Sequence, residues 1–159
     1  MIRSRISLAV AACGVLIGSL LAAAPASASG QTTAAAAPTC NGGAWINVYT
    51  NPVRKLFVPV YNGSYDCQLA QGNYNNWGVV AMQNMLIKCY GQGITRDGDF
   101  GANTKTAVIN AQTWEKVVYG ENIVVDGVYG RETNRAVMWP AYLASGNLDA
   151  SHICVDPAG

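Results

Sequence analysis

The stretch DGDFGANTKTAV at residues 97–108 recurs as DGVYGRETNRAV at residues 126–137. The two copies agree at six of twelve positions. Asp-Gly favours a tight turn because glycine tolerates a positive φ, and the threonine that follows can use its hydroxyl to meet unpaired amides in the first turn of a helix. Each copy is therefore predicted to be a turn plus a helix, which must stack on a neighbour to bury its apolar side.

The residues that the two copies share have structural roles in the turn and the helix start. The aromatic residue packs under the turn, and the second glycine lets the chain swing into the helix. Asp97 and Asp99 resemble part of a calcium loop, but Ala102 and Val108 occupy the positions where an EF-hand needs glycine and glutamate. We assign these residues to structure: Asp97, Gly98, Phe100, Gly101, Thr104, Asp126, Gly127, Tyr129, Gly130 and Thr133.

Three helices are predicted around the repeat. The first covers residues 79–90 and ends at Gly91, with an apolar face formed by Val79, Met82, Leu86 and Cys89. The second covers residues 103–118, with a buried stripe formed by Ala107, Val108, Ala111 and Trp114. The third covers residues 132–139 and is stopped by Pro140. All three helices are expected to share one core, with Phe100, Tyr129 and Trp139 inside it.

A β-hairpin is predicted between Cys40 and Cys67. Residues 45–49 and 56–61 are rich in β-branched and aromatic residues, as strands are. Asn51-Pro52 between them favours a turn. Pro59 lacks an amide donor, so its strand is expected at the edge of the sheet.

Residues 1–28 have the features of a secretory signal peptide. Two arginines precede an apolar run over residues 6–24, and Ala26-Ser27-Ala28 follows as a cleavage site. A membrane anchor and a lipidated Cys13 are the alternatives; the proline before the cleavage site and the apolar stretch after Cys13 disfavour them. Residues 29–39 are predicted to be a flexible leader.

The mature chain would cover residues 29–159, with 10 − 2 = 8 Lys and Arg against 9 Asp and Glu, a net charge of −1. Nucleic-acid binding is excluded on this balance, since it needs a clustered basic surface. Binding to an anionic membrane by bulk charge is excluded for the same reason. A ligand would be held by local hydrogen bonds and stacking, and no cofactor is expected.

Four cysteines remain after the signal peptide, which predicts two disulfides in a secreted chain. We favour Cys40–Cys67, closing the hairpin, and Cys89–Cys154, tying the tail at residues 141–159 to the first helix. The pairing of Cys67 with Cys89 and of Cys40 with Cys154 stays open. Their spacing lacks the close pairs of a zinc site.

The order of these features is similar to that of the peptidoglycan-binding domain found beside bacterial cell-wall hydrolases. Its pattern V-x-x-L-Q-x-x-L, followed by two D-G-x-x-G-x-x-T segments, is matched from Val79 through Gln83 to Thr133. The resemblance covers residues 69–139 and implies a compact three-helix bundle over 68–140 that binds the wall without catalysis. Three departures stand out: Met82 for leucine, Ala111 for an aromatic residue, and an insertion around residues 119–122.

One segment points to an enzyme instead. Ser151-His152-Ile153-Cys154-Val155 resembles the S-H-G-C-V motif of L,D-transpeptidases. Ile153 replaces the glycine, the chain has one histidine, and the stretch after Trp139 is too short for a substrate-holding domain. We predict that the chain is not an enzyme.

The ligand-binding candidates are polar and aromatic residues near the ends of the first and third helices. Aromatic faces stack on sugar rings, and amides pair with hydroxyl and acetamido groups; the alternative for Asn75, Asn76 and Trp77 is helix capping. The candidates are Tyr74, Asn75, Asn76, Trp77, Tyr90, Gln92, Arg96 and Arg131.

The sequence thus predicts a mainly α fold with an N-terminal β-hairpin extension at residues 40–67, stapled by two disulfides. Its predicted function is that of a secreted, monomeric, non-catalytic protein that binds peptidoglycan through glycan or stem peptide. The alternative is an inhibitor or regulator of an extracellular hydrolase that acts through protein contacts.

Overall fold

The structure is a computed structural model that describes residues 36–48, 53–143, 145 and 153–156. The predicted signal peptide, Cys13, the Asn51-Pro52 turn and Ser151-His152 lie outside these residues. No helix in the described part of the chain is long and apolar enough to cross a membrane.

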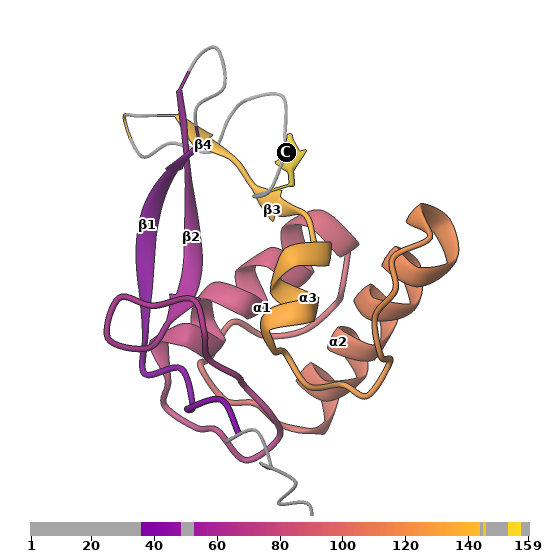
Figure 1. The fold of residues 1–159 in the computed structure, drawn as a ribbon. Helices are drawn as coiled ribbons and strands as arrows, with labels where there is room; N and C mark the ends of the chain where they lie inside the picture. The colour runs from indigo at the N-terminus through magenta and orange to yellow at the C-terminus, as the bar shows by residue number, and fades with distance from the viewer. Residues whose placement is uncertain (1–35, 49–52, 144, 146–152, 157–159) are drawn as a thin grey trace, which may run out of the picture. The chain divides into compact units, whose positions relative to one another are not determined.

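Three α-helices form, as predicted, and are labelled in Figure 1: α1 (Trp77–Tyr90), α2 (Ala102–Trp114) and α3 (Arg131–Ala136). α1 begins at Asn76, whose side chain accepts a hydrogen bond from the Gly78 amide. It ends at Gly91, which takes the left-handed conformation that favours glycine, with φ of 62°. Local sequence signals therefore set both ends of α1.

α2 continues into a π-helix, η1 (Glu115–Tyr119), which ends at Gly120. Gly120 has φ of 76° and repeats the stop at Gly91. Residues 119–122 are therefore the counterpart of residues 90–93 in the first copy.

The third helix is shorter than predicted. α3 ends at Ala136, and Val137 is already extended with φ of −84° and ψ of 145°. Trp139 and Pro140 form β3 (Trp139–Pro140), which pairs with β5 (Cys154–Val155). The prediction of helix through Trp139 was wrong: the residue before a proline is pushed out of the helical region, and Trp139 and Pro140 pair with β5 instead.

The predicted hairpin is confirmed: β1 (Gly42–Val48) and β2 (Arg54–Val60) pair antiparallel. A short third strand, β4 (Tyr142–Leu143), pairs with β2 at Arg54 and Lys55. β2 is therefore the central strand of this sheet. The prediction that the strand with Pro59 lies at the edge was wrong. Pro59 is tolerated because it lies beyond the residues that β4 pairs.

Both favoured disulfides are present, Cys40–Cys67 and Cys89–Cys154, which excludes the alternative pairing. Close to the first of them, Gln68 exchanges backbone hydrogen bonds with Pro38 and Cys40. Pro38 and Thr39, which the sequence assigned to the leader, are thereby joined to the folded part of the chain.

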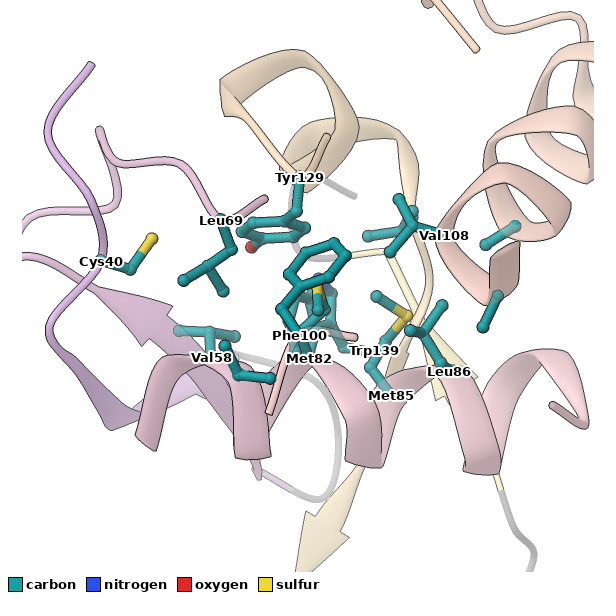
Figure 2. Close-up of a cluster of buried hydrophobic side chains, with 14 of the residues drawn as sticks. Cys40, Val58, Leu69, Met82, Met85, Leu86, Phe100, Val108, Tyr129 and Trp139 are labelled. Carbon is teal, nitrogen blue, oxygen red and sulfur yellow. The ribbon is translucent and has the colours of Figure 1, made fainter. Parts of the chain in front are cut away.

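α1 lies at the centre of the core and contacts β1, β2, β3 and α2. In Figure 2, the rings of Phe100 and Tyr129 lie between Leu69 and Val108, above α1. Phe100, Tyr129 and Trp139 are fully buried, as predicted. Trp114 was predicted to be buried but is 54% exposed, because α2 has its main contacts with α1 and η1 alone.

The predicted three helices, preceding hairpin and two disulfides are thus all found. The expectation of a mainly α fold omits the short strands after α3, which build one sheet with the hairpin and a second with the tail.

Candidate functional site

A groove of about 640 Å³ opens between the hairpin and the N-terminal end of α1. Its aromatic walls come from separate elements: Trp45 on β1 and Phe57 on β2, Trp77 at the start of α1, and Tyr142 on β4. Trp45 is 52% exposed and Trp77 is 67% exposed. The groove therefore presents two large indole surfaces to solvent.

Contacts between aromatic rings hold one wall of the groove. The Trp45 ring centroid lies 5.1 Å from that of Phe57, and 5.1 Å from that of Tyr142 in an edge-on arrangement. The Phe57 ring covers Gly43, where a Cβ atom would come within 2.4 Å of the ring. The Phe57 ring can take this position only because Gly43 has no side chain.

The polar side of the groove is a chain of hydrogen bonds from α1. Asn84 donates from Nδ2 to the Tyr142 hydroxyl at 2.7 Å, and its Oδ1 accepts from the Arg96 guanidinium at 3.3 Å. Asn76 donates to the Cys40 carbonyl at 2.7 Å, which links α1 to the hairpin. Asn75 stands at the rim with a positive φ of 49°, a conformation that asparagine tolerates better than most residues.

A buried glutamine holds the turn below this groove. Gln83 accepts a hydrogen bond from the Gly98 amide at 2.9 Å and donates to Asp97 Oδ1 at 2.8 Å, as well as to the Asp99 carbonyl and the Thr104 hydroxyl. The Gln83 hydrogen bond, together with the Asp99 amide, lowers the pKa of the Asp97 carboxyl. Asp97 is therefore engaged in the turn.

We count with each turn the helix that precedes it, so that every residue of the second copy lies 29 residues after its counterpart in the first. Gln112 is then the counterpart of Gln83 and makes the same set of bonds. It accepts from the Gly127 amide at 2.9 Å and donates to Asp126 Oδ1, to the Val128 carbonyl and to the Thr133 hydroxyl. Gly98 and Gly127 both have a positive φ, of 82° and 74°. The two copies of the repeat are thus built on one hydrogen-bonding plan.

Residues 76–137 match the family model described as a putative peptidoglycan binding domain. The matched segment covers 62 of the chain's 159 residues. Searches of curated proteins and of solved structures found no match. The resemblance inferred from the sequence is therefore confirmed over the segment that contains both copies of the repeat.

The groove reaches beyond the peptidoglycan-binding domain. Trp77, Asn84 and Arg96 lie within residues 76–137, whereas Trp45, Phe57 and Tyr142 lie before or after them. Four of the eight predicted ligand residues line the groove: Asn75, Asn76, Trp77 and Arg96.

The other four predicted residues lie elsewhere. Tyr74 is exposed but does not line the groove. Tyr90 is the last residue of α1 and Gln92 lies just after it, at the opposite end of this helix from Trp77. Arg131 pairs with Asp66 at 2.6 Å beside a separate pocket of about 330 Å³.

Tyr90 belongs to a buried polar cluster. Its hydroxyl donates to Glu115, which is 2% exposed, and accepts from the Met138 amide at 2.8 Å. Burial raises the pKa of the Tyr90 hydroxyl, and the Glu115 hydrogen bond adds to this. Tyr90 therefore joins α1 to η1 and to the chain after α3.

Sequence reasoning missed the polar groove residue Asn84 and three aromatic ones, Trp45, Phe57 and Tyr142. One signal for Trp45 was present: residues 44, 46 and 48 are the apolar face of the strand that packs on the core, so Trp45 falls on the other face. Phe57 and Tyr142 come next to Trp45 only through strand register and the return of the tail. No local pattern gives those contacts.

The transpeptidase-like segment contributes one described site residue, Cys154. Its sulfur is bonded to Cys89. A disulfide sulfur is not a thiolate, so Cys154 cannot be the nucleophile while this bond is intact.

Proposed function

We propose that this chain is a secreted, non-catalytic protein that binds the peptidoglycan of the cell wall. The observation that carries the proposal is the peptidoglycan-binding domain at residues 76–137, whose two turns are both held by a buried glutamine. Two disulfides support a location outside the reducing cytosol. The predicted signal peptide agrees with that location.

The absence of catalysis is part of the proposal. Cys154 is held in a disulfide, and the only histidine, His152, lies outside the described residues. Activity of the transpeptidase type needs a free cysteine thiolate activated by a base. The domain is therefore proposed to hold the chain on the wall rather than to modify it.

Co-sedimentation tests this function. The purified, disulfide-bonded chain is mixed with insoluble peptidoglycan, or with cellulose as a neutral polysaccharide of similar insolubility. We expect the chain in the peptidoglycan pellet and in the cellulose supernatant, with no loss of turbidity of the wall suspension. A chain that stays in both supernatants contradicts the binding function, and clearing of the suspension contradicts the non-catalytic role.

The same assay separates the alternative, in which the chain regulates a secreted hydrolase. Purified wall contains no such enzyme. Retention on purified wall therefore supports wall binding, whereas a regulator would remain in solution until its enzyme was added.

A further inference from the structure

We propose that the hairpin and the tail turn the peptidoglycan-binding domain into a composite site for the N-acetylated glycan strand, with Trp45 and Trp77 as stacking surfaces. The inference rests on the proposed wall-binding function and names the part of the wall that the groove takes. Its basis is the groove between β1, β4 and the start of α1.

The stacking surface is fixed before any ligand arrives. Trp45 touches Phe57 and Tyr142 at ring distances of 5.1 Å, yet half of its own surface is open. A ring that is held in place loses little conformational freedom when a ligand stacks on it. Such a ring is typical of a binding surface.

Hydrogen-bond donors stand beside the rings. The Tyr142 hydroxyl accepts from Asn84, and a phenol that accepts one hydrogen bond can also donate its own proton. One guanidinium nitrogen of Arg96 is fixed on the same Asn84. The amide of Asn75 lies at the rim. Sugars offer hydroxyl and acetamido oxygens, which are acceptors for these donors.

The second copy of the repeat is an internal comparison. A Cβ atom on Gly98 would meet Asn76 and Val80, and one on Gly127 would meet Lys105 and Ile109, which are the counterparts of those two residues in the second copy. Each turn thus meets the same two positions of the segment before it, although α1 begins at Trp77 whereas α2 begins at Ala102, four residues before Thr106. At the same spacing the groove residues Trp77, Asn84 and Arg96 are replaced by Thr106, Thr113 and Val125.

The scaffold therefore does not require an indole, an amide or a guanidinium at these places. The second copy folds on the same glutamine bonds with threonine and valine instead. Trp77 is 67% exposed, so packing in the core does not explain why a tryptophan stands at this position. Asn84 has a structural role, since it bonds Tyr142 and Arg96, but ligand binding accounts for the exposed indole of Trp77, which the core does not need.

The chemistry of the groove favours the glycan over the stem peptide. Among its lining residues Arg96 and Asp97 are the two charged ones, and Asp97 is engaged by Gln83. A stem peptide carries carboxylates and an amine that need matching charges to be desolvated. A glycan strand has uncharged rings with apolar faces, which the two indoles match.

The test is a titration of the disulfide-bonded chain with a tetramer of N-acetylglucosamine, followed by calorimetry. A cellulose tetramer, which lacks the acetamido groups, and a soluble stem peptide are the comparison ligands. The variants are Trp77→Thr, which installs the residue of the second copy, and Trp45→Ala. Trp114→Ala is the matched control, because Trp114 is similarly exposed, at 54%, and does not line the groove.

We expect the N-acetylated tetramer to bind at least about tenfold more tightly than either comparison ligand. Each groove variant should weaken binding about tenfold or more, as loss of a central aromatic contact does, while Trp114→Ala stays within about twofold. Melting curves establish that the variants are folded. If Trp45→Ala unfolds the chain, Trp77→Thr still tests the groove, because Trp77 is exposed.

Two results overturn the glycan site: unchanged affinity in Trp77→Thr, or binding of the stem peptide in preference to the N-acetylated tetramer. Wall sedimentation separates this failure from failure of the proposed function. If the groove variants still sediment with peptidoglycan like the unmodified chain, the wall-binding function stands and the groove assignment falls. If the unmodified chain does not sediment, both fall.

Discussion

Gln83 and Gln112 each hold a turn of the repeat with four or more hydrogen bonds from a fully buried side chain. Leucine has a similar volume but no donor or acceptor. Gln83→Leu would leave the Gly98 amide without its acceptor and would remove the donor that Asp97 and Thr104 share. We expect unfolding in urea to show a loss of about 2–4 kcal/mol, and a similar loss for Gln112→Leu.

Gln71→Leu is the control for this pair. Gln71 is exposed, so its replacement should change the free energy of unfolding by about 0.5 kcal/mol or less. A Gln83→Leu variant as stable as the Gln71 control would show that the glutamine does not hold the turn.

Glu115 gives a prediction for pH. Burial raises the pKa of its carboxyl above the ordinary value of 4.5; the Tyr90 hydrogen bond opposes this rise, and the neighbouring carboxylates of Glu121 and Asp156 add to it. The folded chain therefore holds this proton more tightly than the unfolded chain does. The resulting stabilisation is complete below the unfolded pKa and is lost as the pH rises through the folded pKa.

Glu115→Gln removes this titration and keeps an acceptor for Tyr90. We expect the stability of the variant relative to the unmodified chain to increase as the pH rises from about 4 to about 7, measured by urea unfolding at each pH. Taking the difference cancels Asp97, whose lowered pKa has the opposite effect. A difference that is constant or falls with pH would contradict the shift.

The contact between α1 and the hairpin gives a prediction at the level of elements. Alanine normally stabilises a helix by about 1 kcal/mol relative to glycine. At Gly78, however, a Cβ atom would lie 3.0 Å from the Gly42 carbonyl oxygen and 3.2 Å from Cys40 Cβ. We therefore expect Gly78→Ala to destabilise the chain by about 1–3 kcal/mol in thermal melts.

Gly93→Ala is the matched control for Gly78→Ala. A Cβ atom at Gly93 would meet open space, and this glycine is not among those with a positive φ. Its replacement should leave the melting temperature nearly unchanged. A stabilising Gly78→Ala would mean that the hairpin does not press on α1.

Elements with local signals were predictable from the sequence, and burial was less so. Gly91 ended α1 as predicted because its conformation depends on a few neighbouring residues. Trp114 is the counterpart of Met85 in the second copy, yet Met85 is 1% exposed and Trp114 is 54% exposed. Periodicity identifies the apolar face of a helix, but which neighbour covers it depends on tertiary contacts, and α1 has more of them than α2.

The groove residues likewise fall into those that local signals predicted and those that depend on the whole fold. Asn75, Asn76, Trp77 and Arg96 were predicted because they surround one helix start and one turn. Trp45 and Tyr142 come from near the two ends of the folded part of the chain and meet through β-strand pairing and the Asn84 hydrogen bond. Contacts of that range follow from the whole fold.

The two disulfides hold different parts of the molecule. Removing each one therefore tests whether an effect on wall binding can be separated from a loss of stability. Their sequence separations of 27 and 65 correspond to about 3.5 and about 4.3 kcal/mol in the loop-entropy account. Cys40–Cys67 closes the hairpin that carries Trp45 and Phe57, beside the Asn76 bond to Cys40. Cys89–Cys154 joins the C-terminal end of α1 to β5, at the opposite end of this helix from Trp77.

Replacing each pair by serines should therefore lower stability by about 2–5 kcal/mol, but with different effects on wall binding. At a temperature where both variants are folded, the Cys40→Ser/Cys67→Ser chain should sediment less with peptidoglycan, because the wall of the groove is loosened. The Cys89→Ser/Cys154→Ser chain should sediment nearly as well as the unmodified chain, because Trp45, Trp77 and the Asn76 bond remain in place. Equal loss of sedimentation in both would place the wall contact away from the hairpin, since only the first pair closes it.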